Sequence, residues 1–97
     1  MEFSLDDIVV RDNPQANRFE ASLDDTLMAV AQYERTGNQI TFTHTIVAEA
    51  AEGHGVGGKL VAFALNQARA EALAVVPLCP FVQSYLRQHP EYGDLVR

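Results

Sequence analysis

A glycine-rich segment near the middle of the chain is the clearest candidate for a chemical role. Residues 53–58 read Gly-His-Gly-Val-Gly-Gly and lead into an apolar stretch with helical spacing. Glycines let a ligand approach the backbone closely, and the first amides of a helix have no helical acceptor and attract anions. The segment therefore predicts a phosphate site. The alternative is that its glycines only make a tight connection between a strand and a helix.

Two known phosphate-binding motifs overlap this segment, and neither fits it. Gly53-x-Gly55-x-x-Gly58 matches the dinucleotide fingerprint, but that motif belongs in the first turn of a doubly wound sheet. Residues 53–59 also imitate a P-loop, although Leu60 stands where a serine or threonine would hold magnesium. The remaining interpretation is a Gly55-x-Gly57 helix start whose amides are directed at a pyrophosphate.

Cys79 and His44 are the first candidates for catalysis. Cys79 directly precedes Pro80, which suits the first position of a helix, so we expect the thiol at a helix N-terminus that favours the thiolate. The alternative is a small buried apolar residue. His44 alternates in phase with three apolar residues, Ile40, Phe42 and Ile46. This places it on an otherwise apolar face, either as a core histidine or as a base that reaches the site.

The other histidines and Tyr92 have weaker signals. His54 lies in the glycine segment and is expected to face solvent or a phosphate. His89 would lie about 15 Å along a helix from Cys79, which argues against a direct pair. Tyr92 is predicted to be either a general acid or an anchor for the end of the chain. The cysteine and histidines lack the short paired spacings of a zinc site, so no metal is expected.

Composition limits the classes of protein and partner. The chain has 97 residues, a net charge of −6 and one cysteine, which predicts a single domain over residues 1–97 without a disulfide. An acidic chain is a poor match for nucleic acid, because binding there depends on neutralising phosphates. No apolar run approaches the roughly 20 residues that span a bilayer. We therefore expect a cytoplasmic protein with neither nucleic acid nor membrane as its partner.

The hydrophobic pattern predicts a mixed α/β (α+β) fold. Strands with period two are followed by a change to helical spacing, then by a short apolar run that suits a buried parallel strand. Turn residues separate the early strands, which indicates an antiparallel meander. The predicted strands cover residues 8–11, 18–23, 27–33, 39–47 and 73–78, and the helices cover about 55–72 and 80–88. Residues 93–96 are predicted to form either a small strand or a packed tail.

Several segments together resemble a known family. They are the strand at residues 40–47, the loop at 52–57, and the runs Leu78-Cys79-Pro80-Phe81 and His89-Pro90-Glu91-Tyr92. Over roughly residues 16–96 the chain resembles the small GNAT-like family of the Gcn5-related N-acetyltransferase superfamily. The glycine motif is shared by the whole superfamily, whereas the last two runs are typical of this small single-domain branch.

The resemblance implies a twisted mixed sheet whose fourth and fifth strands splay apart around acetyl-CoA. The pyrophosphate of coenzyme A would rest on the amides of residues 53–58. The implied cofactor-binding residues are Ile46, Val47, Gly53, His54, Gly55, Val56, Gly57 and Gly58. The superfamily usually has arginine or glutamine where this chain has Glu52, and a carboxylate there predicts weak binding of coenzyme A.

The expected function is transfer of an acetyl group from acetyl-CoA to an unidentified amine, on a small molecule or a protein. Transfer is either direct or through an acetyl thioester on Cys79. One alternative is a CoA-binding or protein-interaction module without transferase activity. A third interpretation is a structural domain that binds no nucleotide.

Overall fold

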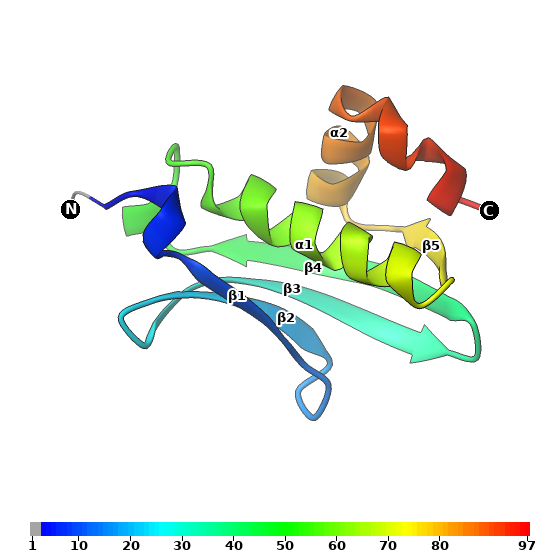
Figure 1. The fold of residues 1–97 in the computed structure, drawn as a ribbon, viewed down its shortest axis with the longest axis horizontal. Coiled ribbons are helices and arrows are strands. Elements are labelled where there is room, and N and C mark those ends of the chain that lie inside the picture. The colour runs from blue at the N-terminus through cyan, green and yellow to red at the C-terminus, as the bar shows by residue number, and fades with distance from the viewer. Residues whose placement is uncertain (1–2) are drawn as a thin grey trace.

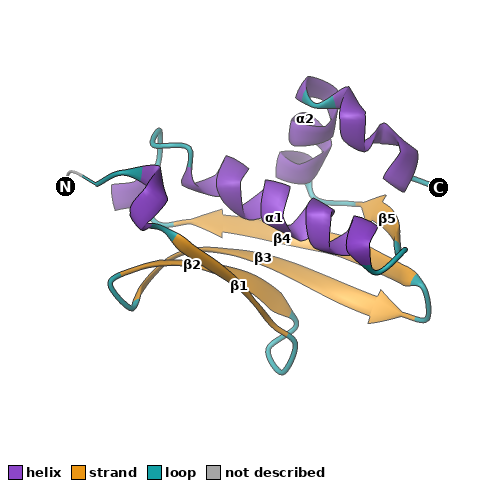
Figure 2. Ribbon diagram, viewed as in Figure 1, coloured by secondary structure: helices purple, strands orange, loops and turns teal. Residues whose placement is uncertain are grey.

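The fold has two layers, a sheet and a pair of helices that cover one of its faces (Figure 1). The computed structural model describes residues 3–97. The five-stranded sheet has the order β1-β2-β3-β4-β5, with antiparallel pairing up to β4 and parallel pairing between β4 and β5. Figure 2 shows both helices on the same side of the strands. The predicted mixed α/β class is confirmed.

The observed elements follow the predicted order along the chain. The strands are β1 (Val9–Asn13), β2 (Arg18–Leu23), β3 (Thr26–Thr36), β4 (Gln39–Val47) and β5 (Ala74–Pro77). The α-helices are α1 (Val56–Ala70) and α2 (Pro80–Gln88), and the short 3₁₀ helices are η1 (Leu5–Asp7), η2 (Glu49–Ala51) and η3 (Pro90–Leu95). The end of the chain forms η3 and an isolated parallel bridge between Val75 and Val96, so both expectations for residues 93–96 hold in part.

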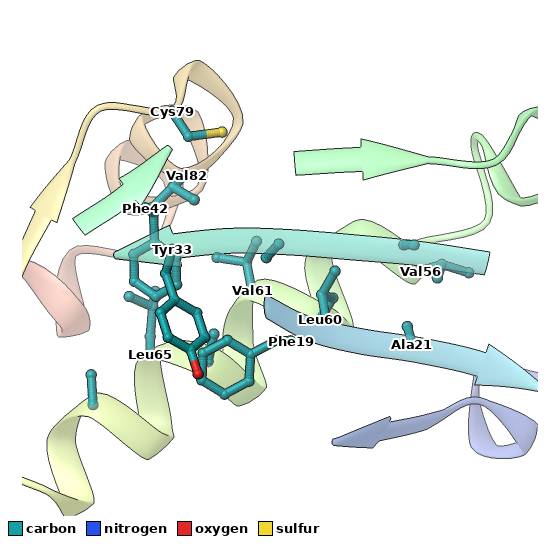
Figure 3. Close-up of a cluster of buried hydrophobic side chains, with 14 of the residues drawn as sticks. Phe19, Ala21, Tyr33, Phe42, Val56, Leu60, Val61, Leu65, Cys79 and Val82 are labelled. Carbon is teal, nitrogen blue, oxygen red and sulfur yellow. The ribbon is translucent and has the colours of Figure 1, made fainter. Parts of the chain in front are cut away.

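The core lies between the sheet and α1 because each element buries one face. Apolar side chains of α1 recur at helical spacing and pack on aromatic and small residues that alternate along the strands. α2 adds Val82 at one end of this layer (Figure 3). The central members are Phe19, Ala21, Tyr33, Phe42, Val56, Leu60, Val61, Leu65 and Val82. No helix within residues 3–97 is long and apolar enough to cross a membrane.

A β-bulge in β4 changes which side chains face the helices. Gln32 of β3 pairs with His44 while Tyr33 pairs with Phe42, so Thr43 is an extra residue without a partner. Phe42 faces the core before the bulge, and the alternation is reversed after it. His44 is therefore exposed on the helix-free face, and the expectation that it shares an apolar face with Ile40 and Phe42 is wrong.

The parallel strands β4 and β5 separate after a short pairing. Their register runs from Gln39 opposite Ala74 to Phe42 opposite Pro77. The carbonyl of Phe42 then accepts hydrogen bonds from the amides of both Leu78 and Cys79, at 3.1 and 3.0 Å, and the chain turns into α2. β4 continues to Val47 without β5 beside it, so this edge of β4 is open over residues 43–47.

The helix-free face carries a buried carboxylate. Glu20 of β2 is only 4% exposed because Arg11, Arg18 and Asn13 surround it. Its closest contact is with Nε of Arg18, at 2.8 Å. The hydrogen bond from Arg18, helped by those from Asn13 and Arg11, lowers the pKa of Glu20 below its ordinary value, against the opposing effect of burial.

Candidate functional site

A hollow of about 340 Å³ opens where β4 and β5 separate. β4 forms one wall, the start of α1 and the preceding loop form another, and α2 contributes an aromatic ring. The lining residues are Thr45 and Val47 of β4, Phe81 of α2, and Ala51, Glu52, Gly53, Gly55, Val56, Gly57 and Gly58. Most of the glycine segment singled out from the sequence thus borders a single hollow.

The start of α1 presents unbonded amides to this hollow. Gly55 is the N-cap residue in a left-handed conformation, at φ 81°, and has no side chain that could cap the helix. Lys59 is the first residue whose amide bonds to the Gly55 carbonyl. Within residues 3–97, the amides of Val56, Gly57 and Gly58 have no hydrogen-bond acceptor. Together with the helix dipole they form a local site for an anion.

The ammonium of Lys59 is engaged elsewhere and does not act as a P-loop lysine. Its Nζ donates hydrogen bonds to the carbonyls of Leu5 and Ile8, the latter at 2.9 Å. These bonds fasten the N-terminal segment to α1. Any anion at the helix start is therefore held by backbone amides and not by this side chain.

Gly57 and Phe81 are in direct contact where α1 and α2 meet. A Cβ atom built on Gly57 would lie 2.6 Å from Cζ of Phe81, closer than real Cβ contacts. Phe81 is 40% exposed as a residue and borders the hollow. The absence of a side chain at residue 57 is what allows the ring to rest on the helix backbone.

Cys79 is the N-cap residue of α2, as expected, and Figure 3 shows its side chain at the start of that helix. The thiol is buried, at 2% exposure, and Sγ lies 3.3 Å from Oγ1 of Thr45. Thr45 borders the hollow while Cys79 does not. The threonine side chain thus connects the thiol to the hollow.

The other sequence candidates lie outside the hollow. His44 and Ile46 are exposed after the bulge, and Ile46 borders a separate shallow hollow with Leu27 and Val30. His54 is exposed, with its ring 5.1 Å from that of Phe3.

Tyr92 serves the packing of the C-terminal segment on α1. Its hydroxyl donates a hydrogen bond of 3.1 Å to Oδ1 of Asn66, and the guanidinium of Arg69 lies 5.9 Å from the centre of its ring. Arg69 also forms a bidentate pair with Asp94. This geometry favours the anchoring role over that of a general acid.

Glu52 borders the hollow beside the unbonded amides. It follows η2 directly, and its side chain is exposed. A carboxylate at this place opposes the anion that the amides attract. In the part of the chain that the structure describes, no group of three or more His, Cys, Asp or Glu side chains is placed to hold a metal ion.

Thr45 and Phe81 line the hollow but have no strong sequence signal that points to a site. Thr45 faces the hollow only because the bulge at Thr43 shifts the alternation, and an unbroken period of two points it the other way. Along the sequence, Phe81 fits the apolar spacing of α2 together with Val82 and Tyr85. Its place directly after Pro80, at the first turn of a helix beside the opening, was the available signal.

The sheet, the separated parallel strands and the glycine-rich helix start define the fold class of the GCN5-related acetyltransferases. Residues 18–95 match the sequence model of the GCN5-related N-acetyl-transferase family, and the chain belongs to this family. It is also similar to a GCN5-like protein from Staphylococcus aureus, solved by NMR in solution. Sequence identity is 26%, the match covers 94% of this chain and 89% of that one, and the TM-score is 0.73. No curated protein is significantly similar in sequence.

Proposed function

We propose that residues 1–97 form one N-acetyltransferase domain, which binds acetyl-CoA and transfers its acetyl group to an amine. The observation that carries the proposal is the set of unbonded amides at Val56, Gly57 and Gly58, beside a hollow of about 340 Å³. A pyrophosphate supplies the anion that such amides attract. Family membership supports this choice, because GCN5-related acetyltransferases generally use acetyl-CoA.

The open edge of β4 suits the pantetheine arm. Residues 43–47 have no β5 partner on this side, so some of their backbone groups are available to another chain of amides. The arm of coenzyme A contains two peptide-like amides and could lie along this edge. With its pyrophosphate at the α1 start, its thioester would point toward Thr45 and Cys79.

In direct transfer, the amine nitrogen attacks the thioester carbonyl. A C–N bond forms, the C–S bond breaks, the electron pair leaves with the sulfur of coenzyme A, and the amine proton passes to that sulfur or to water. This route needs no rearrangement of the wall around Thr45. The acceptor amine, on a small molecule or a protein, reaches the thioester through the opening of the hollow. The compartment that we propose for this reaction is the cytoplasm.

The alternative route passes through Cys79. Its thiolate attacks the thioester, an acetyl–Sγ bond forms and coenzyme A leaves, after which the amine attacks the new thioester and restores the thiol. Because Sγ is buried and in contact with Thr45, this route requires the threonine side chain to turn aside.

A second candidate function is binding of coenzyme A without transfer. It is favoured by the placement of His44 and Tyr92, the two candidate proton-transfer groups, because neither borders the hollow. Coenzyme A would then act as a sensed ligand. The carboxylate of Glu52 beside the anion site agrees with weak, reversible binding of this kind.

Incubation with acetyl-CoA separates these functions. The protein and its Cys79→Ser variant are incubated with acetyl-CoA, with or without spermidine or a lysine-containing peptide, and intact masses are measured. Acetylated amine from both proteins indicates direct transfer, and a gain of one acetyl group that requires Cys79 indicates the thioester route. Binding of acetyl-CoA with neither product indicates the module without transfer, and an absence of binding contradicts both functions.

A further inference from the structure

The helix-free face of the sheet carries exposed apolar side chains. Both α-helices lie on the other side of the strands (Figure 2), so this face is open to solvent across β1 to β4. An antiparallel sheet with one open face normally presents polar side chains there, because its apolar ones point into the core. Ile46 of β4 is nevertheless 57% exposed, and Leu27 of β3 is 42% exposed.

Pairing between the strands places these two side chains together. Val30 of β3 pairs with Glu20 on one side and with Ile46 on the other. In the next row, Leu27 pairs with Ser22, which lies two residues beyond Glu20 on β2. Side chains two residues apart on a strand share a face, and so do side chains paired across strands. Both rows therefore point to the helix-free face.

Leu27, Val30 and Ile46 form a continuous apolar patch. They border one shallow hollow of about 140 Å³, together with Met28, Ala29 and Ala48. Single apolar side chains on a surface are ordinary, whereas apolar side chains that adjoin one another mark contact surfaces. The apolar patch is therefore a candidate interface.

Opposite charges lie beyond the two ends of the apolar patch. At one end is the β2–β3 turn, where Asp24 and Asp25 are exposed and, within residues 3–97, form no ion pair. Toward the other end, Arg18 and Arg11 share the single carboxylate of Glu20, so two guanidinium charges face one negative charge. The same face thus has an acidic end and a basic end.

We infer that this face binds a second copy of the chain, face to face about a two-fold axis that crosses the strands. Such an axis reverses the strand direction, so the acidic turn of each copy lies over the Arg18 end of the other. Along β3, Leu27 and Val30 lie between Asp25 and Gln32, the residue that pairs with Arg18. The apolar patches therefore meet in the middle, with complementary charges on both sides.

The charge pattern favours a copy of this chain over another partner. A two-fold interface joins one surface to itself, so it needs both signs of charge on the same face at matching distances from the centre. A partner with one sign of charge would match only one end of this face. The net charge of −6 opposes association at long range, so the local pairs and the apolar patch must supply the attraction.

The dimer has a defined relation to the hollow of about 340 Å³ between β4 and α1. After the bulge, Ile46 points to the helix-free face, whereas Thr45 and Val47 border that hollow. Two sheets that pack face to face lie about 10 Å apart, with the helices of each copy on the outside. Both hollows remain open in such a dimer, so the inference does not depend on the proposed function.

Sedimentation velocity tests the inference directly. Between roughly 10 µM and 1 mM the wild type should pass from monomer to dimer, the range of a small interface. Ile46→Lys and Leu27→Lys should each weaken association at least about tenfold, because a two-fold interface contains each substitution twice. Val96→Lys is the control, since this residue is 43% exposed and pairs with Val75 beyond the β5 edge. Circular dichroism checks that each variant is folded.

Neutralising the acidic turn distinguishes local pairing from general repulsion. The double variant Asp24→Asn, Asp25→Asn removes two negative charges, and asparagine tolerates the positive φ of both residues. General repulsion alone predicts tighter association, whereas pairing with Arg18 predicts association weakened roughly 3- to 10-fold. The control is Glu52→Gln with Glu91→Gln, which removes the same charge from two exposed residues outside this face. This control should associate at least as tightly as the wild type.

Three results would overturn the inference. They are a wild type that is monomeric at about 1 mM, lysine variants that associate as tightly as the wild type, and an Asp24, Asp25 variant that associates more tightly. If a lysine variant does not fold, NMR spectra of the wild type over the same concentrations give an independent readout. Amide shifts that depend on concentration should gather at residues 27–30 and 44–46, and shifts confined to α1 and α2 would contradict the assignment.

Discussion

The ring of Phe81 rests on the backbone of Gly57, so tightly that a Cβ atom at residue 57 would lie 2.6 Å from the ring. This contact joins α2 to the first turn of α1, beside the amides proposed to bind the pyrophosphate. Gly58, the next residue, has a different environment. A Cβ atom there would meet only Cε2 of Tyr85, at an ordinary 3.8 Å.

Alanine substitutions at these two glycines should therefore have opposite effects on stability. Gly58→Ala should stabilise the fold by up to about 1 kcal/mol, because alanine loses less backbone entropy in a helix. Gly57→Ala displaces the ring of Phe81 and should destabilise the fold by about 1 kcal/mol. The cost of forcing a methyl group into this contact exceeds the entropy advantage of alanine in a helix. Thermal unfolding of both variants measures the difference, and a stabilised Gly57→Ala variant would show that the contact is not tight.

Reversal of charge at Glu52 should strengthen binding of coenzyme A. Glu52→Arg replaces a repulsive carboxylate by an attractive guanidinium at the edge of the first hollow, and we expect a gain of about fivefold to tenfold at low salt. Glu49→Arg is the matched control, because this exposed glutamate of η2 undergoes the same change of charge without bordering the hollow. If calorimetry finds that both variants bind coenzyme A with the same affinity, the gain comes from the overall charge of the protein and Glu52 lies outside the site.

Removal of the Thr45 side chain should expose Cys79. The thiol is 2% exposed and its neighbour Thr45 borders the hollow, so Thr45→Ala opens a path for reagents from the hollow to Sγ. Labelling by iodoacetamide should become several-fold faster than in the wild type. Thr43→Ala is the control, because Thr43 lies on the same strand as Thr45 but its hydroxyl donates a hydrogen bond to the Gln32 carbonyl of β3. Fast labelling of the wild type would show that the thiol is already accessible.

The buried carboxylate of Glu20 should make stability depend on pH. The pKa of Glu20 in the folded state lies below the ordinary value of 4.5. The charged carboxylate therefore adds its full contribution to the free energy of unfolding above pH 4.5, and this contribution is lost as pH falls through the folded-state pKa. Glu20→Gln should lower the free energy of unfolding by roughly 1–2 kcal/mol near pH 7, because the charged hydrogen bonds from Arg18 and Arg11 are weakened.

Denaturant unfolding of the wild type and of Glu20→Gln at a series of pH values measures how much the Glu20 charge contributes to the free energy of unfolding. The difference between the two proteins should shrink below about pH 4.5 and vanish once Glu20 is protonated in the folded protein. Glu34→Gln, at an exposed position, serves as the control. A difference that stays constant down to pH 2 would mean that the carboxylate charge contributes nothing.

Most of the secondary structure could be predicted because it depends on local patterns. The period of two in β2 and β4, the helical spacing of α1 and the proline at the start of α2 are visible in the sequence. The parallel β4–β5 pair follows from the strand–helix–strand order. The glycine segment likewise predicts where α1 begins.

The parts that could not be predicted depend on contacts between strands. Nothing near Thr43 marks the bulge, which arises from the register of β3 against β4, yet it turns His44 outward and Thr45 inward. The cluster around Glu20 likewise requires β1 and β2 to place Arg11 opposite the carboxylate. Sequence periodicity alone cannot supply such cross-strand information.

The central claim is that the amides at the start of α1 bind the pyrophosphate of coenzyme A. An NMR titration of ¹⁵N-labelled protein with coenzyme A tests it most directly. The amide signals of Val56, Gly57 and Gly58 should shift most strongly, followed by those along the open edge of β4 at residues 43–47. Unchanged signals at all three helix-start amides with millimolar coenzyme A would contradict the claim.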